Sequence, residues 1–91
     1  MTGEKIQTLH PHGKTGRNID LQKYEMLKKA ILKVLHGREL THNELFDHLN
    51  KELQRKFEGN IGWYGETVKL DLEARKVIER TSSKPQKYRV R

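Results

Sequence analysis

Hydrophobic residues recur at spacings of three and four early in the chain, which predicts a first amphipathic helix over residues 21–36. Asp20 is a suitable N-cap for this helix, and Gly37 is a suitable stop because glycine adopts the left-handed conformation that often ends a helix. Lys29 and Lys33 share the other side of the helix, where they form either a solvated surface or a row of phosphate contacts. The apolar face consists of Tyr24, Leu27, Ile31, Val34 and Leu35.

A second helix is predicted over residues 42–57, and residues 38–40 before it could form a short strand. Thr41 and Glu44 have the spacing of a capping box. In that motif the Thr41 hydroxyl accepts a hydrogen bond from the Glu44 amide, and the Glu44 carboxylate accepts one from the Thr41 amide. Such a cap is worth about 1 kcal/mol. The buried stripe of this helix consists of Leu45, Phe46, Leu49, Leu53 and Phe57.

The stretch that follows supports two interpretations. Apolar and charged residues alternate from Val68 onward, as in a strand, yet Tyr64, Val68 and Leu72 are spaced four apart, as on one face of a helix. Good helix formers dominate this stretch and β-branched residues are scarce. We therefore expect a third helix over residues 65–75.

The start of this third helix is open. Asn60 could cap an earlier start, but Gly62 and Gly65 would then lie inside the helix at a cost of about 1 kcal/mol each. A start near Gly65 avoids most of that cost. Trp63 and Tyr64 would then sit at the junction, where core packing is the favoured role and stacking on a base or filling a pocket of a partner is the alternative.

The orientation of the third helix bears on function. If Val68 and Leu72 face the core, then Glu66, Lys69 and Glu73 face outward. Two carboxylates on that surface would oppose the phosphates of a duplex and weaken docking of the helix in a major groove.

Strand propensity rises after Lys76. Residues 77–78 and 88–90 suit strands, and residues 81–85 between them contain the serines and proline typical of a turn. The pattern predicts a strand, a loop and a second strand that returns beside the first.

This end of the chain resembles a winged-helix domain, in which a third helix ends in a Leu-Glu pair and a two-stranded wing follows. The resemblance covers about residues 20–91 and implies an α+β, mostly helical fold with three helices and a C-terminal β-hairpin wing. That family commonly has glycine between helix and wing, where this chain has Lys76. The matching elements are Leu72-Glu73, Val77-Ile78, Arg80 and Tyr88-Arg89-Val90.

The chain also resembles small bacterial proteins of unassigned function that share its Trp-Tyr and Val-Lys-Leu-Asp-Leu-Glu-Ala-Arg elements. We expect a winged-helix domain at residues 20–91 and a flexible N-terminal arm at residues 1–19. The arm has no hydrophobic period, and its glycines and proline favour irregular backbone.

The composition narrows the function classes. The chain has no cysteine, which removes disulfides, zinc–thiolate sites and thiol nucleophiles. No apolar run approaches the roughly 20 residues that span a bilayer, and the N-terminus lacks an apolar signal core. No local motif predicts catalysis. We expect a cytoplasmic protein that is not an enzyme and has no metal or cofactor.

The formal net charge of +7 favours an anionic partner. Residues 76–91 carry six lysines and arginines against one glutamate, so the positive charge concentrates in the predicted wing. We predict that the wing contacts the backbone of duplex DNA with little sequence specificity, as a transcription regulator could. The predicted nucleic-acid contacts are Lys69, Lys76, Arg80, Lys84, Lys87, Arg89 and Arg91.

The alternative function is a protein-interaction module, in which Trp63 and Tyr64 anchor a protein partner. An exposed Trp63 would favour this alternative, whereas a buried one would remove the anchor. The sequence shows no spare long helix or apolar stripe for self-association, so we expect a monomer or a weak homodimer.

Overall fold

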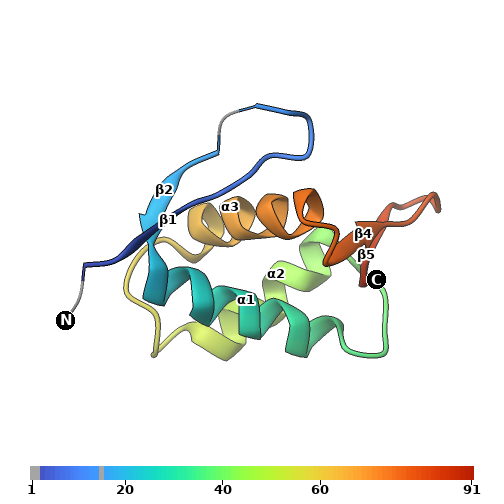
Figure 1. The fold of residues 1–91 in the computed structure, drawn as a ribbon. Coiled ribbons are helices and arrows are strands. Elements are labelled where there is room, and N and C mark those ends of the chain that lie inside the picture. Colours follow the sequence, from blue (N-terminus) through green and yellow to red (C-terminus); the bar gives the residue numbers. More distant parts are fainter. Residues whose placement is uncertain (1–2, 15) are drawn as a thin grey trace.

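The computed structural model describes residues 3–14 and 16–91, which form three helices and two small antiparallel sheets (Figure 1). The helices are α1 (Leu21–Leu35), α2 (His42–Leu53) and α3 (Ile61–Ala74). The strands are β1 (Lys5–Gln7), β2 (Asn18–Asp20), β3 (Leu40–Thr41), β4 (Ile78–Arg80) and β5 (Lys87–Val90).

The starts of α1 and α2 confirm the predicted caps. The Asp20 carboxylate accepts a hydrogen bond from the Lys23 amide at 3.1 Å, and Gly37 follows α1 with a φ of +72°. At α2 both hydrogen bonds of the Thr41–Glu44 capping box are present. Each cap satisfies amides that the first turn of a helix leaves without a partner. Helix α2 ends at Leu53, four residues before the predicted end.

Helix α3 begins earlier than predicted. Its first residue is Ile61, and the Asn60 side chain accepts a hydrogen bond from the Trp63 amide at 2.9 Å. Gly65 therefore lies inside the helix, where a Cβ atom would come within 2.7 Å of the Phe46 ring. The missing side chain lets α2 and α3 approach closely, and this packing together with the cap outweighs the low helix propensity of glycine.

The three helices bury their apolar faces against one another and against two strands. Tyr88 of β5 and Ile78 of β4 close one end of this core, and Ile19 of β2 joins it from the N-terminal sheet. The helical core residues are Tyr24, Leu27, Ala30, Ile31, Val34, Leu35, Leu45, Leu49, Leu53, Val68 and Leu72.

The other sheet has three strands in the order β3-β5-β4, with both strand pairs antiparallel. Leu40 pairs with Tyr88, and Ile78 pairs with Val90. The short strand expected before α2 is present, shifted to residues 40–41. The expected C-terminal hairpin is therefore part of a larger sheet. Lys76, between α3 and β4, has a φ of +63°, a left-handed conformation that favours glycine.

The N-terminal segment, expected to be a flexible arm without regular structure, contains a two-stranded sheet. Strands β1 and β2 pair antiparallel with Ile6 opposite Ile19. The buried Thr8 side chain accepts a hydrogen bond from the Arg17 amide at 2.7 Å, and its hydroxyl lies 3.0 Å from the Arg17 carbonyl oxygen, to which it donates. Residues 1, 2 and 15 of the predicted arm lie outside the described residues. Strands of three residues are too short to produce a detectable period.

The buried carboxylate of Asp71 on α3 fastens this N-terminal sheet to the helices. One oxygen accepts from the Leu9 amide at 2.8 Å, and the other accepts from the Tyr24 hydroxyl of α1. The Nε of Arg75 donates to both oxygens at 2.9 Å. Asp71 is fully buried, so these donors replace the water that its charge has lost.

The Tyr24 hydroxyl is expected to stay protonated in alkaline solution. Burial, together with its hydrogen bond to Asp71, raises the Tyr24 pKa well above the ordinary value of 10.0. Because the folded-state pKa exceeds the unfolded one, this contribution to stability is complete below pH 10 and is lost as pH rises toward the folded-state pKa.

An ultraviolet titration of tyrosinate absorbance checks this expectation. Tyr24 should ionise only as the protein unfolds. Replacing Tyr24 by Phe should remove that late step from the titration. An unchanged late step in the Phe variant would contradict the assignment.

Candidate nucleic-acid interface

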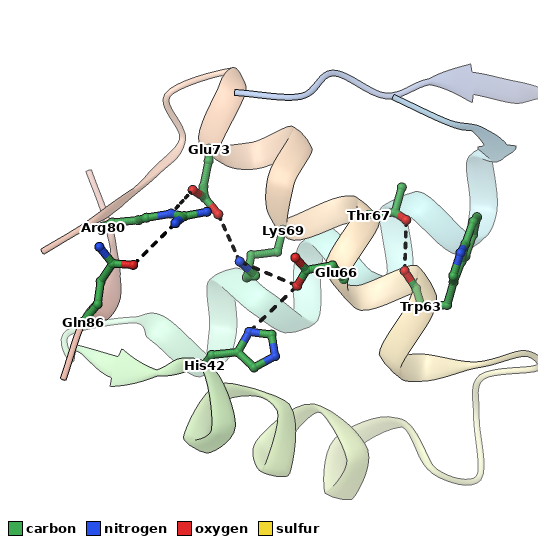
Figure 2. A network of polar contacts seen from close by, with 8 residues as sticks. All are labelled: His42, Trp63, Glu66, Thr67, Lys69, Glu73, Arg80 and Gln86. Carbon is green, nitrogen blue, oxygen red and sulfur yellow. Dashed lines mark hydrogen bonds and ion pairs between the residues drawn. The ribbon is translucent and has the colours of Figure 1, made fainter. Parts of the chain in front are cut away.

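The arginines of β4 and β5 are held by carboxylates. Arg89 donates to Glu79 at 2.7 Å and to Glu39 at 2.8 Å, and Arg91 lies 3.4 Å from Glu79. Arg80 pairs with Glu73 and also donates to Gln86, as Figure 2 shows. These contacts neutralise much of the strip that the sequence predicted to be basic.

The same hydrogen bonds raise the pKa values of Arg80 and Arg89. The bond to Glu73 is the largest cause for Arg80, and the bonds to Glu79 and then Glu39 are the largest for Arg89. A guanidinium beside a carboxylate carries less net charge toward a phosphate, although its remaining N–H groups can still donate. Because exposed ion pairs such as those of Arg89 contribute little to stability, exchange of a carboxylate for a phosphate there brings little gain in affinity.

The lysines of the same region are different. Lys76, Lys84 and Lys87 form no ion pair with any carboxylate of residues 3–14 and 16–91. Lys76 and Lys84 are exposed and Lys87 is half-buried. Of the seven cations predicted to bind nucleic acid, these three therefore form no ion pair within the described residues. The hydrogen bond from the Thr41 amide and, more weakly, the charge of Lys87 lower the pKa of the nearby Glu44 carboxyl.

Lys69, predicted to face outward and bind nucleic acid, is instead buried, with 1% of its surface exposed. Its Nζ lies 3.1 Å from Glu73 and 3.7 Å from Glu66, and 4.2 Å from the centre of the Tyr88 ring. The other helices cover the side of α3 that carries Val68, and the three-stranded sheet covers the side that carries Lys69. The buried face of α3 is therefore wider than predicted. The outward orientation of Lys69 was wrong.

A polar network links this buried lysine to both neighbouring elements (Figure 2). Glu66 lies 3.8 Å from Nδ1 of His42 at the start of α2, and the His42 ring stacks on Phe46 with centroids 4.4 Å apart. Glu73 connects Lys69 to Arg80 of β4. The network positions α2, α3 and β4 relative to one another, and its carboxylates have their cations already beside them.

Trp63 and Tyr64 have different environments in the structure. Trp63, for which core packing was the favoured expectation, keeps 45% of its surface exposed. Tyr64 is half-buried, its ring centre 5.4 Å from that of Phe57 and 4.9 Å from the Lys23 Nζ. The Trp63 ring meets Tyr64 edge-on at 83°, with centroids 4.9 Å apart. Tyr64 thus supports the indole, and only Trp63 is a candidate contact.

The N-terminal loop, residues 8–14 and 16–17, lies along the outer side of α3, at the top of Figure 1. Between loop and helix is an open hollow of about 360 Å³, which Trp63, Thr67 and Leu70 line from the helix and Lys14 and Arg17 from the loop. A second hollow, of about 440 Å³, adjoins it near the end of α3. This part of the site could not be predicted, because nothing in the sequence of residues 8–17 indicates contact with α3, about 60 positions later.

The chain belongs to a protein family whose model matches residues 5–88, the family of unknown function DUF6958. The match begins at the first residue of β1 and so includes the N-terminal sheet with the helices. No curated protein and no solved structure gives a significant match to the chain.

Neither a membrane-spanning helix nor a metal cluster occurs in the part of the chain that the structure describes. None of its helices combines the length and the apolar character needed to cross a bilayer. No three or more His, Asp or Glu side chains of this part gather where they could hold a metal ion.

Proposed function

We propose that residues 20–91 form a winged-helix domain and that the protein binds nucleic acid mainly through its phosphate backbone. The order helix, strand, helix, helix, strand, strand supports this fold assignment. So does the three-stranded sheet, in which the last strand lies between the other two. In this proposal β4, β5 and the loop between them are the wing.

The observation that carries the function is the set of three lysines that form no ion pair within the described residues. Lys84 lies in the wing loop, Lys87 begins β5, and Lys76 lies at the base of the wing. Phosphate binding releases counterions that condense on nucleic acid, and cations without a carboxylate partner gain most from it. The net charge of +7 adds a long-range attraction of the same sign.

Docking of α3 in a major groove is disfavoured. The N-terminal loop lies along the outer side of the helix, with Leu9 held by Asp71. Lys69, the only lysine of α3, is buried. The proposed contacts therefore position a backbone rather than distinguish bases.

The test neutralises the three lysines together, as Lys76→Gln, Lys84→Gln and Lys87→Gln. We expect the slope of log affinity against log salt to flatten by about 3, because each phosphate contact contributes about 0.9 to that slope. Binding to a short duplex and to a single strand of mixed sequence is measured at about 50 and 200 mM salt. Both substrates should lose affinity alike.

A matched control removes the same charge from another surface, as Lys29→Gln, Lys51→Gln and Lys56→Gln. These three side chains are exposed and lie on α1 and around the end of α2. Their replacement should leave the slope nearly unchanged. Equal losses in the two variants would mean that net charge, not the wing, drives binding, and no binding at the lower salt concentration would reject the function.

A protein-interaction role remains the second candidate, and the exposure of Trp63 favours it. Large aromatic side chains are frequent anchors of protein interfaces, and 45% of this one is accessible. Under this alternative a Trp63→Ala change would abolish capture of a protein partner while nucleic-acid affinity stayed the same.

A further inference from the structure

The hollow beside Trp63 combines a flat aromatic face with basic residues. Trp63 lies in the first turn of α3, and its ring packs edge-on with that of Tyr64. The Trp63 carbonyl oxygen accepts a hydrogen bond from the Thr67 hydroxyl at 2.9 Å, visible in Figure 2. The aromatic side chain is therefore held on a rigid element while much of its surface stays open.

The walls of the hollow differ in chemistry. Leu9 and Leu70 contribute apolar surface, whereas Lys14 and Arg17 contribute positive charge from the N-terminal loop. Glu66 is the acidic member, and it lies beside Lys69 and His42. A ligand with a planar apolar part and a negative charge fits these walls better than a purely apolar one.

The hollow continues toward the proposed wing. Leu9, His10 and Lys14 also line the second hollow, which extends to Lys76 at the far end of α3. At 1.5 Å per residue the 14 residues of α3 span roughly 21 Å. The track from Trp63 to Lys76 is therefore several times longer than one base and has cations at both ends.

The N-terminal loop keeps a duplex out of this path. A duplex is read by an element that enters a groove about 12 Å wide, and the N-terminal loop occupies that side of α3. An open hollow of about 360 Å³ suits one unstacked base instead. Stacking of bases on aromatic side chains between basic residues is the usual mode of single-strand binding.

We propose that the protein binds single-stranded nucleic acid, with one unpaired base stacked on Trp63 and its flanking phosphates on Lys14 and Arg17. The strand then follows α3 to Lys76 and the wing. This inference rests on the proposed function and narrows it to an unpaired strand.

Fluorescence gives a site-specific test, because Trp63 is the only tryptophan of the chain. A thymidine oligonucleotide should quench the Trp63 emission and bind at least ten times more tightly than a hairpin duplex with the same number of phosphates. Replacing Trp63 by Leu should lower single-strand affinity about tenfold, since stacking on one aromatic residue is worth about 1–3 kcal/mol. Duplex affinity should not change.

Two further variants separate stacking from folding and charge. Trp63→Phe keeps an aromatic face and should retain most of the single-strand affinity. Lys14→Gln with Arg17→Gln should weaken single-strand binding and leave the fold intact, because Arg17 contacts Thr8 through its backbone rather than its side chain. Thermal unfolding of each variant confirms that it is folded.

The outcomes distinguish the inference from the function on which it rests. Equal affinity for duplex and single strand, with unchanged Trp63 emission, overturns the inference and leaves the wing proposal standing. Absence of binding to either at about 50 mM salt overturns both. Quenching by a glutamate-rich peptide but not by the oligonucleotide would assign the hollow to an acidic protein segment and likewise overturn the inference.

Discussion

Replacing Asp71 by Ala is expected to lower the free energy of unfolding by about 3 kcal/mol. The substitution removes the acceptor for the Leu9 amide and for the buried Tyr24 hydroxyl, and it leaves Arg75 without its carboxylate. An unsatisfied buried donor costs about 1–3 kcal/mol. The Arg75 side chain is partly exposed and can turn to solvent, so the tyrosine and the amide carry most of the loss.

Chemical denaturation of Asp71→Ala measures the loss, and Asp47→Ala is the matched control. Asp47 is exposed on α2 and forms no ion pair within the described residues, so its replacement should change stability by less than about 0.5 kcal/mol. Hydrogen exchange should show faster exchange of the Leu9 amide in Asp71→Ala. Equal stability of the two variants would mean that the N-terminal sheet is held by other contacts.

Replacing Gly65 by Val is expected to cost about 2–3 kcal/mol, although valine forms helices more readily than glycine. A Cβ at this position would lie 2.7 Å from one carbon of the Phe46 ring and 3.2 Å from the next. The two γ-methyl groups of valine enlarge the clash, and a side-chain carbon of Leu49 lies 3.6 Å from the same Cβ position. The helices would have to separate or the Phe46 ring would have to leave its position.

The control is Gly62→Val, at an exposed position of the same helix where the nearest atom is the Asn60 side-chain oxygen at 3.2 Å. It should cost clearly less than Gly65→Val in thermal unfolding. Adding Phe46→Leu to Gly65→Val should recover part of the loss, because the two sites share one contact. Additive losses would show that the ring does not limit the approach of the helices.

Local signals in the sequence predicted the helices well. Asp20 and the Thr41–Glu44 pair act within three or four residues, and their caps depend on nothing distant. The same local reasoning failed at Gly65. The low helix propensity of glycine predicted a later helix start. Only the position of Phe46, 19 residues earlier in the chain, shows that a side chain at position 65 would have no room.

The orientation of Lys69 could not be predicted for a related reason. A lysine is seldom fully buried unless it is paired, and its partners come from two different elements. Glu73 is one turn away on α3, but Tyr88 lies on β5. The wider buried face of α3 becomes apparent only when the sheet is placed against it.

The candidate site was predicted by composition rather than by geometry. The excess of cations after residue 75 was evident, but Arg89 pairs with Glu39, 50 residues earlier in the chain. Only the folded structure therefore shows which cations of residues 76–91 are paired with carboxylates and which lysines are not. The N-terminal loop gave no signal at all, since it meets α3 through a backbone amide and a single buried carboxylate.

The bond between Leu9 and Asp71 joins positions 62 residues apart. During synthesis, the Leu9 amide therefore has no Asp71 acceptor until the ribosome has made α3, and β3 cannot pair until β5 follows. Helices α1 and α2 can pair first because they are neighbours in the chain. Strands β1 and β2 can pair with each other early, but Leu9 stays without its contact to α3, open to proteases and chaperones, until the third helix emerges.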